Sequence, residues 1–237
     1  MTTDNPVCDA PLEIIKFTRP LPHVVQSVRT SQRLKVVAIG SSSTQGFGTT
    51  DPRFAYPARL QDILSAKFSE GIVVVLNKGQ GGEEAGDELK RFERDVIDEK
   101  PDLVIWQVGT NAVWKNYDLD ATLSQIRQGV QKLKPLDLDC VLMDLQYTPA
   151  LLDNAHSRST EYMVEQIGAV AEAANINVFR RFALMKHLSC EEHIGFDKIV
   201  SPLDPDKLHQ SDWSYNCLAE ALALSILDAL AINQESS

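Results

Sequence analysis

The chain has 237 residues, of which 43% are hydrophobic and 24% are charged, and its formal net charge is −10. Such a composition is typical of one globular domain, and the excess of acidic residues excludes a nucleic-acid groove or an anionic membrane surface, since both need clustered Lys and Arg. The four cysteines include no Cys-x-x-Cys pair, and no basic segment followed by an apolar run marks a leader or a membrane span. We therefore expect a cytoplasmic protein.

Hydrophobic periodicity predicts strands that alternate with helices along the chain. Residues 1–33 are rich in proline and are expected to form an N-terminal arm, with a short helix near Val24–Thr30. The expected strands are 34–39, 72–76, 103–108, 139–145 and 176–179, and the expected helices are 51–68, 83–100, 120–134, 159–174, 181–188 and 212–231. Right-handed crossovers between such strands predict an α/β domain over residues 34–237, with one five-stranded parallel sheet covered by helices on both faces.

The first strand runs directly into a loop of small and hydroxylated residues. Apolar residues from Val36 to Ile39 precede Gly40, and the next eight residues, as far as Gly48, are three Ser, one Thr, two Gly, one Gln and one Phe. In open α/β sheets, ligands bind outside the carboxyl ends of the strands, so one of these hydroxyls is a candidate nucleophile. A turn without chemistry and a loop that cradles a phosphate are the alternatives for the same pattern.

Two further strands end in loops with groups that suit acyl-transfer chemistry. Ser42 offers a hydroxyl, Gly82 a backbone N–H in a glycine-rich turn, and Asn111 a side-chain amide. Since the carboxyl ends of parallel strands share one edge of the sheet, these groups are expected to converge. Asp206 and His209 precede the last helix and offer a carboxylate and an imidazole three residues apart, which would complete a Ser–His–Asp arrangement.

At this point the chain resembles the SGNH, or GDSL-type, hydrolase family over roughly residues 34–231. The resemblance lies in four blocks in order, namely Gly40-Ser41-Ser42-Ser43-Thr44, Asn77-x-Gly79-x-x-Gly82, Gly109-Thr110-Asn111 and Asp206-x-x-His209. It implies a flavodoxin-like three-layer α/β/α fold and serine esterase activity. By the same resemblance, Ser42 is the nucleophile, His209 the base and Asp206 its orienting partner, and the N–H groups of Ser42 and Gly82 with the Asn111 side chain form the oxyanion hole.

Three positions depart from the family pattern. Ser41 stands where an Asp usually precedes the nucleophile, Ala112 replaces the common Asp after the third-block Asn, and Ser214 replaces the Gly of a frequent Gly-Tyr pair. None of these changes removes a group from the chemistry. They place the chain in a side branch of the family.

Several other residues are weaker candidates for the site. Asp204 competes with Asp206 as the partner of the histidine, and the shorter spacing of Asp206 matches the family block. Trp114 and Tyr147 lie just beyond strand ends and could line a substrate pocket, although simple packing is an equal alternative.

A zinc site is a further possibility that the sequence raises. His187, Cys190 and His193 are three residues apart, but structural zinc sites need four closed ligands and no fourth is evident nearby. We expect a solvated loop over the active site there, and neither a metal nor a cofactor.

The expected function is hydrolysis of small carboxylic esters through an acyl-enzyme on Ser42. Short acyl groups such as the acetyl esters of sugars are favoured, because the chain shows no long apolar lid for a fatty-acyl groove. Acyl transfer, thioester hydrolysis and lysophospholipid hydrolysis by the same residues stay open. The alternative from another class is a non-enzymatic, flavodoxin-like module that binds a phosphate or a carbohydrate. No oligomeric state follows from the sequence.

Overall fold

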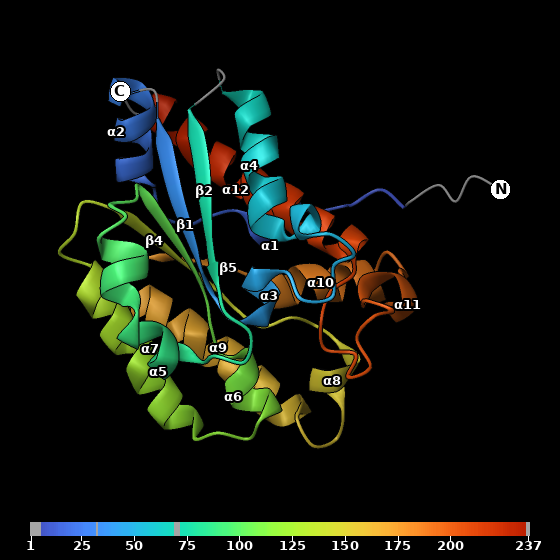
Figure 1. Cartoon of the computed structure of the whole chain (residues 1–237). Coiled ribbons are helices and arrows are strands. Elements are labelled where there is room, and N and C mark those ends of the chain that lie inside the picture. The colour runs from blue at the N-terminus through green and yellow to red at the C-terminus, as the bar shows by residue number, and fades with distance from the viewer. Residues whose placement is uncertain (1–5, 32, 69–71, 236–237) are drawn as a thin grey trace.

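In the computed structural model, which describes residues 6–31, 33–68 and 72–235, five strands form one parallel sheet (Figure 1). The strands are β1 (Leu34–Gly40), β2 (Val73–Gly79), β3 (Leu103–Gln107), β4 (Asp139–Met143) and β5 (Asn177–Phe179). Their order in the sheet is β2-β1-β3-β4-β5, which is the flavodoxin-like order. The predicted fold class is confirmed.

The central strands are buried on both faces because the sheet lies between two layers of helices. Every residue of β3 and β4 is buried, and both strands are continuous apolar runs apart from a few polar side chains. β1 pairs with β2 on one side and with β3 on the other, and Val36 is paired with Leu103. Such uninterrupted burial is the reason that the sequence pattern of these strands is apolar rather than alternating.

Each face of the sheet carries its own hydrophobic core. Helices α2 (Pro22–Ser31), α4 (Tyr56–Lys67), α10 (Arg181–Cys190) and α12 (Asp212–Glu235) contribute to the core on one face. Helices α5 (Ala85–Lys90), α7 (Leu119–Leu133) and α9 (Ser157–Ala174) contribute to the core on the other (Figure 1). The chain is therefore a three-layer α/β/α sandwich.

Two of the expected helices differ in detail from the prediction. Asp51 accepts a hydrogen bond from the Arg53 amide but caps only a 3₁₀ turn, Pro52–Phe54, and the α-helix begins at Tyr56. The helix expected over 83–100 is divided into α5 and a π-helical turn, Glu93–Ile97. The buried Arg91 lies between the two parts, where its side chain donates hydrogen bonds to the Gly40 carbonyl and the Asp95 carboxylate.

The described part of the N-terminal arm belongs to the core. Helix α1 (Leu12–Ile15) is followed by α2, and Ile15, Phe17 and Leu21 are buried in the core that α12 also lines. The Val24 amide, in the first turn of α2, donates a 2.9 Å hydrogen bond to Asp139. Among the described helices, none has the length and hydropathy needed to cross a bilayer.

Short helices at the carboxyl ends of the strands position the candidate site (Figure 1). Helix α3 (Ser42–Gln45) follows β1, α6 (Thr110–Trp114) follows β3, α8 (Pro149–Leu152) follows β4, and α11 (Phe196–Ile199) precedes the last loop. The sequence pattern predicted none of these short helices. The order of the strands reverses between β1 and β3, and in such sheets ligands bind at that reversal.

Candidate active site

Ser42 and His209, which are 167 positions apart in the chain, are hydrogen-bonded in the structure. Ser42 is the first residue of α3, and its Oγ lies 2.8 Å from Nε2 of His209. His209 lies in the loop between α11 and α12, where its carbonyl accepts a hydrogen bond from the Ser201 amide. This loop therefore brings an imidazole to the end of β1, as the sequence predicted.

The carboxylate hydrogen-bonded to the imidazole is that of Asp204, and not that of Asp206, which the sequence predicted as the partner of His209. Asp204 Oδ2 lies 2.9 Å from Nδ1 of His209, and the same oxygen accepts hydrogen bonds from the backbone amides of Leu208 and His209 at 2.8 and 2.6 Å. Asp204 is 4% exposed, whereas Asp206 is exposed to solvent.

The conformation of the turn decides which of the two aspartates faces the ring. The Asp206 amide donates to Asp204 Oδ1, and the Lys207 amide donates to the Asp204 carbonyl. Lys207 then has a φ of +54°, in the left-handed region, which sends the chain back toward His209. The Asp204 carboxylate thus accepts hydrogen bonds from the backbone amides of the turn, whereas Asp206 lies on the solvent side of the turn. The spacing of the residues alone carries no information about this reversal.

The environment of the pair keeps His209 neutral and Asp204 ionised near neutral pH. Burial is the main effect that lowers the pKa of His209 below its usual value, and the bond and charge of Asp204 oppose it. Burial would raise the pKa of Asp204, but its hydrogen bonds from the His209 and Leu208 amides and from the imidazole hold that pKa below the ordinary value. With Nδ1–H bonded to Asp204, Nε2 is free to accept the Ser42 proton.

This electrostatic arrangement predicts the pH dependence of ester hydrolysis. Because the base must be neutral, kcat/KM falls as the pH decreases through the pKa of His209. Since burial lowers this pKa, we expect the midpoint of the acid limb below about 6.5, the pKa of an unperturbed histidine. This midpoint is measured from the pH profile of kcat/KM with an ester substrate that does not itself ionise over the pH range. A midpoint above about 6.5 would contradict the assignment of His209 as the base.

Buried polar contacts hold the nucleophile loop against the next strand. The Gln107 Oε1, at the end of β3, accepts hydrogen bonds from the Ser41 amide at 3.1 Å and from the Ser41 hydroxyl at 3.0 Å. Gly40 has no room for a side chain, because a Cβ there would lie 2.5 Å from Thr44 Oγ1 and 2.9 Å from Gln107. These contacts fix the first turn of α3, from which Ser42 projects.

The second and third loops meet beside this turn, as predicted. Gly81 lies against the nucleophile, since a Cβ built on Gly81 would be 3.8 Å from Ser42 Cβ. Gly82 follows with a φ of +83°, and the Asn111 side chain donates a 2.7 Å hydrogen bond to the Glu83 carbonyl. One of the two amide hydrogens of Asn111 is used in this way. The structure thus brings the predicted oxyanion-hole residues to the loops that flank Ser42, and their role stays a prediction.

Glu84 joins these two loops and has no counterpart in the sequence prediction. Its buried carboxylate accepts hydrogen bonds from the Gly109 amide at 3.1 Å and from the Ala112 amide at 2.6 Å. It therefore binds the backbone on both sides of Asn111. Burial raises the pKa of Glu84, and the amide hydrogen bonds oppose this rise. A glutamate at the start of a charged helix carries no signal of such a role.

Removal of the Asn111 amide should weaken catalysis without abolishing it. Loss of one oxyanion donor typically costs about 10²–10³ in kcat, because the remaining donors still stabilise the tetrahedral intermediate. We expect a fall of this size for Asn111→Ala, with little change in KM. Steady-state kinetics measures it, and a matched Asn116→Ala variant, at the exposed position after α6, serves as the control. A loss of less than about threefold would exclude Asn111 from the oxyanion hole.

The two aromatic residues expected in a substrate pocket have aromatic neighbours of their own. The Trp114 ring lies 5.3 Å from that of His156, and the Tyr147 ring lies 5.2 Å from that of Phe182. The cavity next to the nucleophile turn, of about 430 Å³, is lined by neither of them, and its lining residues are Gln45, Gly46, Phe47, Gly48, Thr49, Pro52 and Leu203. Substrate contact by Trp114 or Tyr147 stays a prediction.

Phe47 lines this cavity and also contacts the imidazole of His209. Its ring centroid lies 4.5 Å from that of His209, and half of the Phe47 side chain is exposed. The Phe47 carbonyl accepts a hydrogen bond from the Tyr215 hydroxyl at 3.0 Å, which holds the loop in place. Leu203, which also lines the cavity, is exposed as well. The sequence prediction missed both apolar residues, because an isolated apolar residue in a loop has no distinctive pattern.

The family model described as the Non-GDSL lipase-like family matches residues 7–232. An acetylxylan esterase from Geobacillus stearothermophilus is 27% identical over 202 residues, which are 79% of this chain and 85% of that protein. The crystal structure of an acetylxylan esterase from that organism matches with a TM-score of 0.66 and 27% identity, and the match covers 81% of this chain and 94% of the other. A structure from Desulfitobacterium hafniense, assigned to the lipolytic G-D-S-L family, matches with a TM-score of 0.67 and 25% identity over 81% of this chain and 99% of the other.

Catalytic mutants of the Geobacillus stearothermophilus acetylxylan esterase replace a serine, an aspartate or a histidine with alanine. In that esterase the aspartate precedes the histidine by three positions, which is the spacing of Asp206 and His209. The present chain has a second aspartate two positions earlier, Asp204, and this is the one that contacts the ring.

Proposed function

Because this chain belongs to the Non-GDSL lipase-like family and holds a serine hydroxyl against a buried imidazole, we propose that it is a serine esterase of acetylated carbohydrates. The resemblance to SGNH hydrolases is confirmed, and the chain is an ester-bond hydrolase. The observation that carries the residue assignment is the continuous chain of contacts from Ser42 Oγ through His209 to Asp204. A module that only bound phosphate would have no use for this chain of contacts.

In the proposed mechanism, the acyl group passes from the ester to Ser42 and then to water. His209 Nε2 takes the proton of Ser42 Oγ as this oxygen attacks the ester carbonyl. Asp204 holds the Nδ1–H tautomer and stabilises the imidazolium that forms. His209 then protonates the leaving alcohol, and the same nitrogen activates the water that releases the carboxylic acid and regenerates Ser42.

The Ser42 and Gly82 amides and the Asn111 side chain are proposed to stabilise the oxyanion. This set is supported by the contact of the second loop with Ser42 and by the link from Asn111 to the Glu83 carbonyl. Donors that are held before the reaction begins need no reorganisation as charge develops on the carbonyl oxygen. Glu84 supplies this rigidity by binding the amides on either side of Asn111.

The proposed substrate is a small acyl ester of a sugar. The similar acetylxylan esterases support an acetyl group and a carbohydrate alcohol. The cavity that follows the nucleophile turn is open and carries the exposed apolar side chains of Phe47 and Leu203, which suit the apolar face of a sugar ring. The cysteines among the described residues are free, which supports a reducing compartment such as the cytoplasm as part of the same proposal.

Hydrolysis of paired substrates tests this function. We expect higher kcat/KM for p-nitrophenyl acetate than for p-nitrophenyl octanoate, and release of acetate from acetylated xylo-oligosaccharides. A fluorophosphonate probe should label Ser42, as peptide mass spectrometry would show. Faster turnover of octanoate would overturn the acetyl specificity, and a folded protein that neither hydrolyses esters nor reacts with the probe would overturn the esterase assignment.

A further inference from the structure

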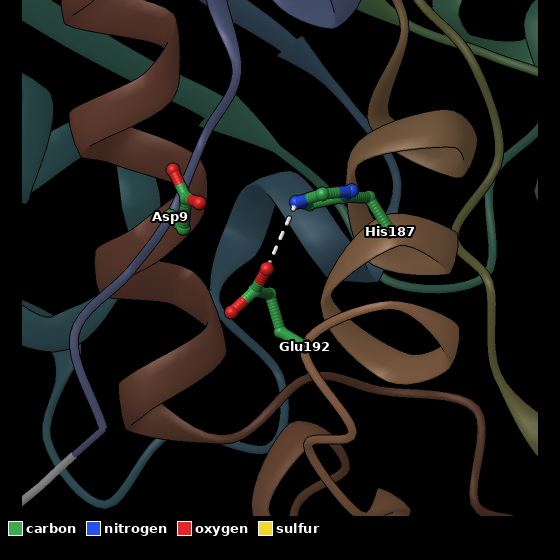
Figure 2. A group of neighbouring side chains, drawn as sticks. All are labelled: Asp9, His187 and Glu192. Carbon is green, nitrogen blue, oxygen red and sulfur yellow. Dashed lines mark ion pairs between the residues drawn. The ribbon is translucent and has the colours of Figure 1, made fainter.

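A cluster of one imidazole and two carboxylates lies where the N-terminal arm crosses the end of α10 (Figure 2). Asp9 belongs to the arm, His187 lies on α10, and Glu192 lies in the turn that follows this helix. One ligand atom from each of the three lies within 4.8 Å of the other two. Figure 2 shows the imidazole and both carboxylates turned toward a common centre.

The buried member of the cluster is His187, which has no well-aligned hydrogen bond. The residue is 8% exposed, and neither Nδ1 nor Nε2 of its ring has a hydrogen-bond partner. Nε2 lies 3.6 Å from Glu192 Oε1, and Nδ1 lies 3.2 Å from Glu191 Oε2, in both cases as ion-pair contacts. Buried polar groups are normally hydrogen-bonded, so an imidazole in this state indicates an additional binding partner at the ring.

The distances in the cluster are those of ligands around a small transition-metal cation. Nitrogen and oxygen ligands of a tetrahedral Zn²⁺, at about 2.0–2.2 Å from the ion, lie about 3.4 Å from each other. The 3.6 Å between His187 Nε2 and Glu192 Oε1 is close to that value. Asp9 and Glu192 are exposed, so their side chains are free to close the remaining distance.

Glu191 supplies the outer contact that metal-bound histidines usually have. A histidine that binds a metal through one nitrogen generally donates the other N–H to a carboxylate or a carbonyl, which fixes the orientation of the ring. With Nε2 toward the centre of the cluster, Nδ1 faces Glu191. The glutamate is thus placed to orient the ring without being a ligand.

This cluster differs from the zinc set that the sequence raised. His193 is exposed and has a φ of +56°, and the Cys190 thiol lies 3.5 Å from the Tyr147 hydroxyl. Neither belongs to the cluster. The fold pairs His187 instead with Asp9, which comes from the other end of the chain.

We propose that Asp9, His187 and Glu192 form a site for a divalent transition-metal cation such as Zn²⁺, which fastens the N-terminal arm to α10. One imidazole and two carboxylates suit borderline and hard divalent cations, with water as the remaining ligand. Two carboxylates also balance the charge of the cation. The metal site takes no part in the proposed ester hydrolysis. Its role is to hold the N-terminal arm against the domain. A second contact of the arm is the hydrogen bond that the Pro6 carbonyl accepts from Trp213 Nε1.

Titration of the full-length protein with ZnCl₂ tests the proposal. Isothermal titration calorimetry should show one Zn²⁺ per chain, and zinc should raise Tm, an effect that EDTA reverses. His187→Asn should lose the binding, and Asp9→Asn and Glu192→Gln should each weaken it by at least about tenfold. Glu191→Gln should weaken it by about tenfold, as is typical when an outer partner is removed.

Matched variants distinguish zinc binding at Asp9, His187 and Glu192 from zinc binding at Cys190 and His193. Cys190→Ser and His193→Asn remove the residues of the sequence set and should leave zinc affinity unchanged. Glu192→Gln changes one exposed side chain and keeps the test valid even if His187→Asn does not fold. Anomalous scattering at the zinc edge should locate the ion between Asp9 and His187. No binding at millimolar zinc, unchanged affinity in Glu192→Gln, or an ion at His209 would overturn the proposal.

Discussion

Ser42→Ala should lower kcat for ester hydrolysis by about 10⁶-fold, because removal of the nucleophile of a serine-hydrolase triad eliminates the covalent step. The Oγ that lies 2.8 Å from His209 is lost, while the proposed oxyanion donors and the cavity next to the nucleophile turn stay in place. A residual rate above that of water is expected from these groups alone. The variant should also fail to react with the fluorophosphonate probe.

Ser43→Ala is the matched control for this prediction. Ser43 follows Ser42 in the same helical turn, but it is buried and its side chain is hydrogen-bonded to Tyr215. It should keep both probe labelling and most of the activity. Steady-state kinetics with p-nitrophenyl acetate and peptide mass spectrometry measure the two outcomes, and far-UV circular dichroism confirms the fold. If Ser42→Ala kept activity within tenfold of the unmodified protein, another residue would be the nucleophile.

Asp204→Asn should lower kcat by about 10⁴-fold, whereas Asp206→Asn should change it by less than about threefold. The comparable substitution in a serine protease triad has an effect of the larger size because the imidazole is no longer held in the productive tautomer. Asparagine retains an oxygen that can accept from the Leu208 and His209 amides, so the turn should still form. Asp206 is exposed and does not bond to the ring.

The acid limb of the pH profile gives an independent measurement of the same assignment. The hydrogen bond and the charge of Asp204 raise the pKa of His209 against the larger effect of burial. Their removal in Asp204→Asn should therefore move the limb to lower pH. Asp206 raises this pKa through its charge alone, so its variant should move the limb less. If Asp206→Asn lost activity and Asp204→Asn kept it, Asp206 would be the triad carboxylate, as the spacing of the family block implies. The turn between Asp204 and His209 would then have to rearrange during catalysis.

The pattern of apolar and polar residues is enough to predict the layers of the fold, and together with the family blocks it predicts two members of the candidate triad. Continuous apolar runs such as Val36–Ile39 are stable only when buried on both faces, so they predict central parallel strands without knowledge of the neighbours. The position of Ser42 and Asn111 after such strands then follows, because parallel strands end at one edge. His209 was found through its place before the last helix and the family block.

The carboxylate that contacts His209 and the contacts that hold the site in place become apparent only in the folded structure. The choice of Asp204 depends on the left-handed conformation of Lys207, which spacing does not encode. The roles of Gln107 and Glu84 depend on which backbone amides the fold brings to them. The cluster at His187 needs Asp9 from the opposite end of the chain. Local patterns report burial and chain direction, whereas these contacts arise from segments that meet only after folding.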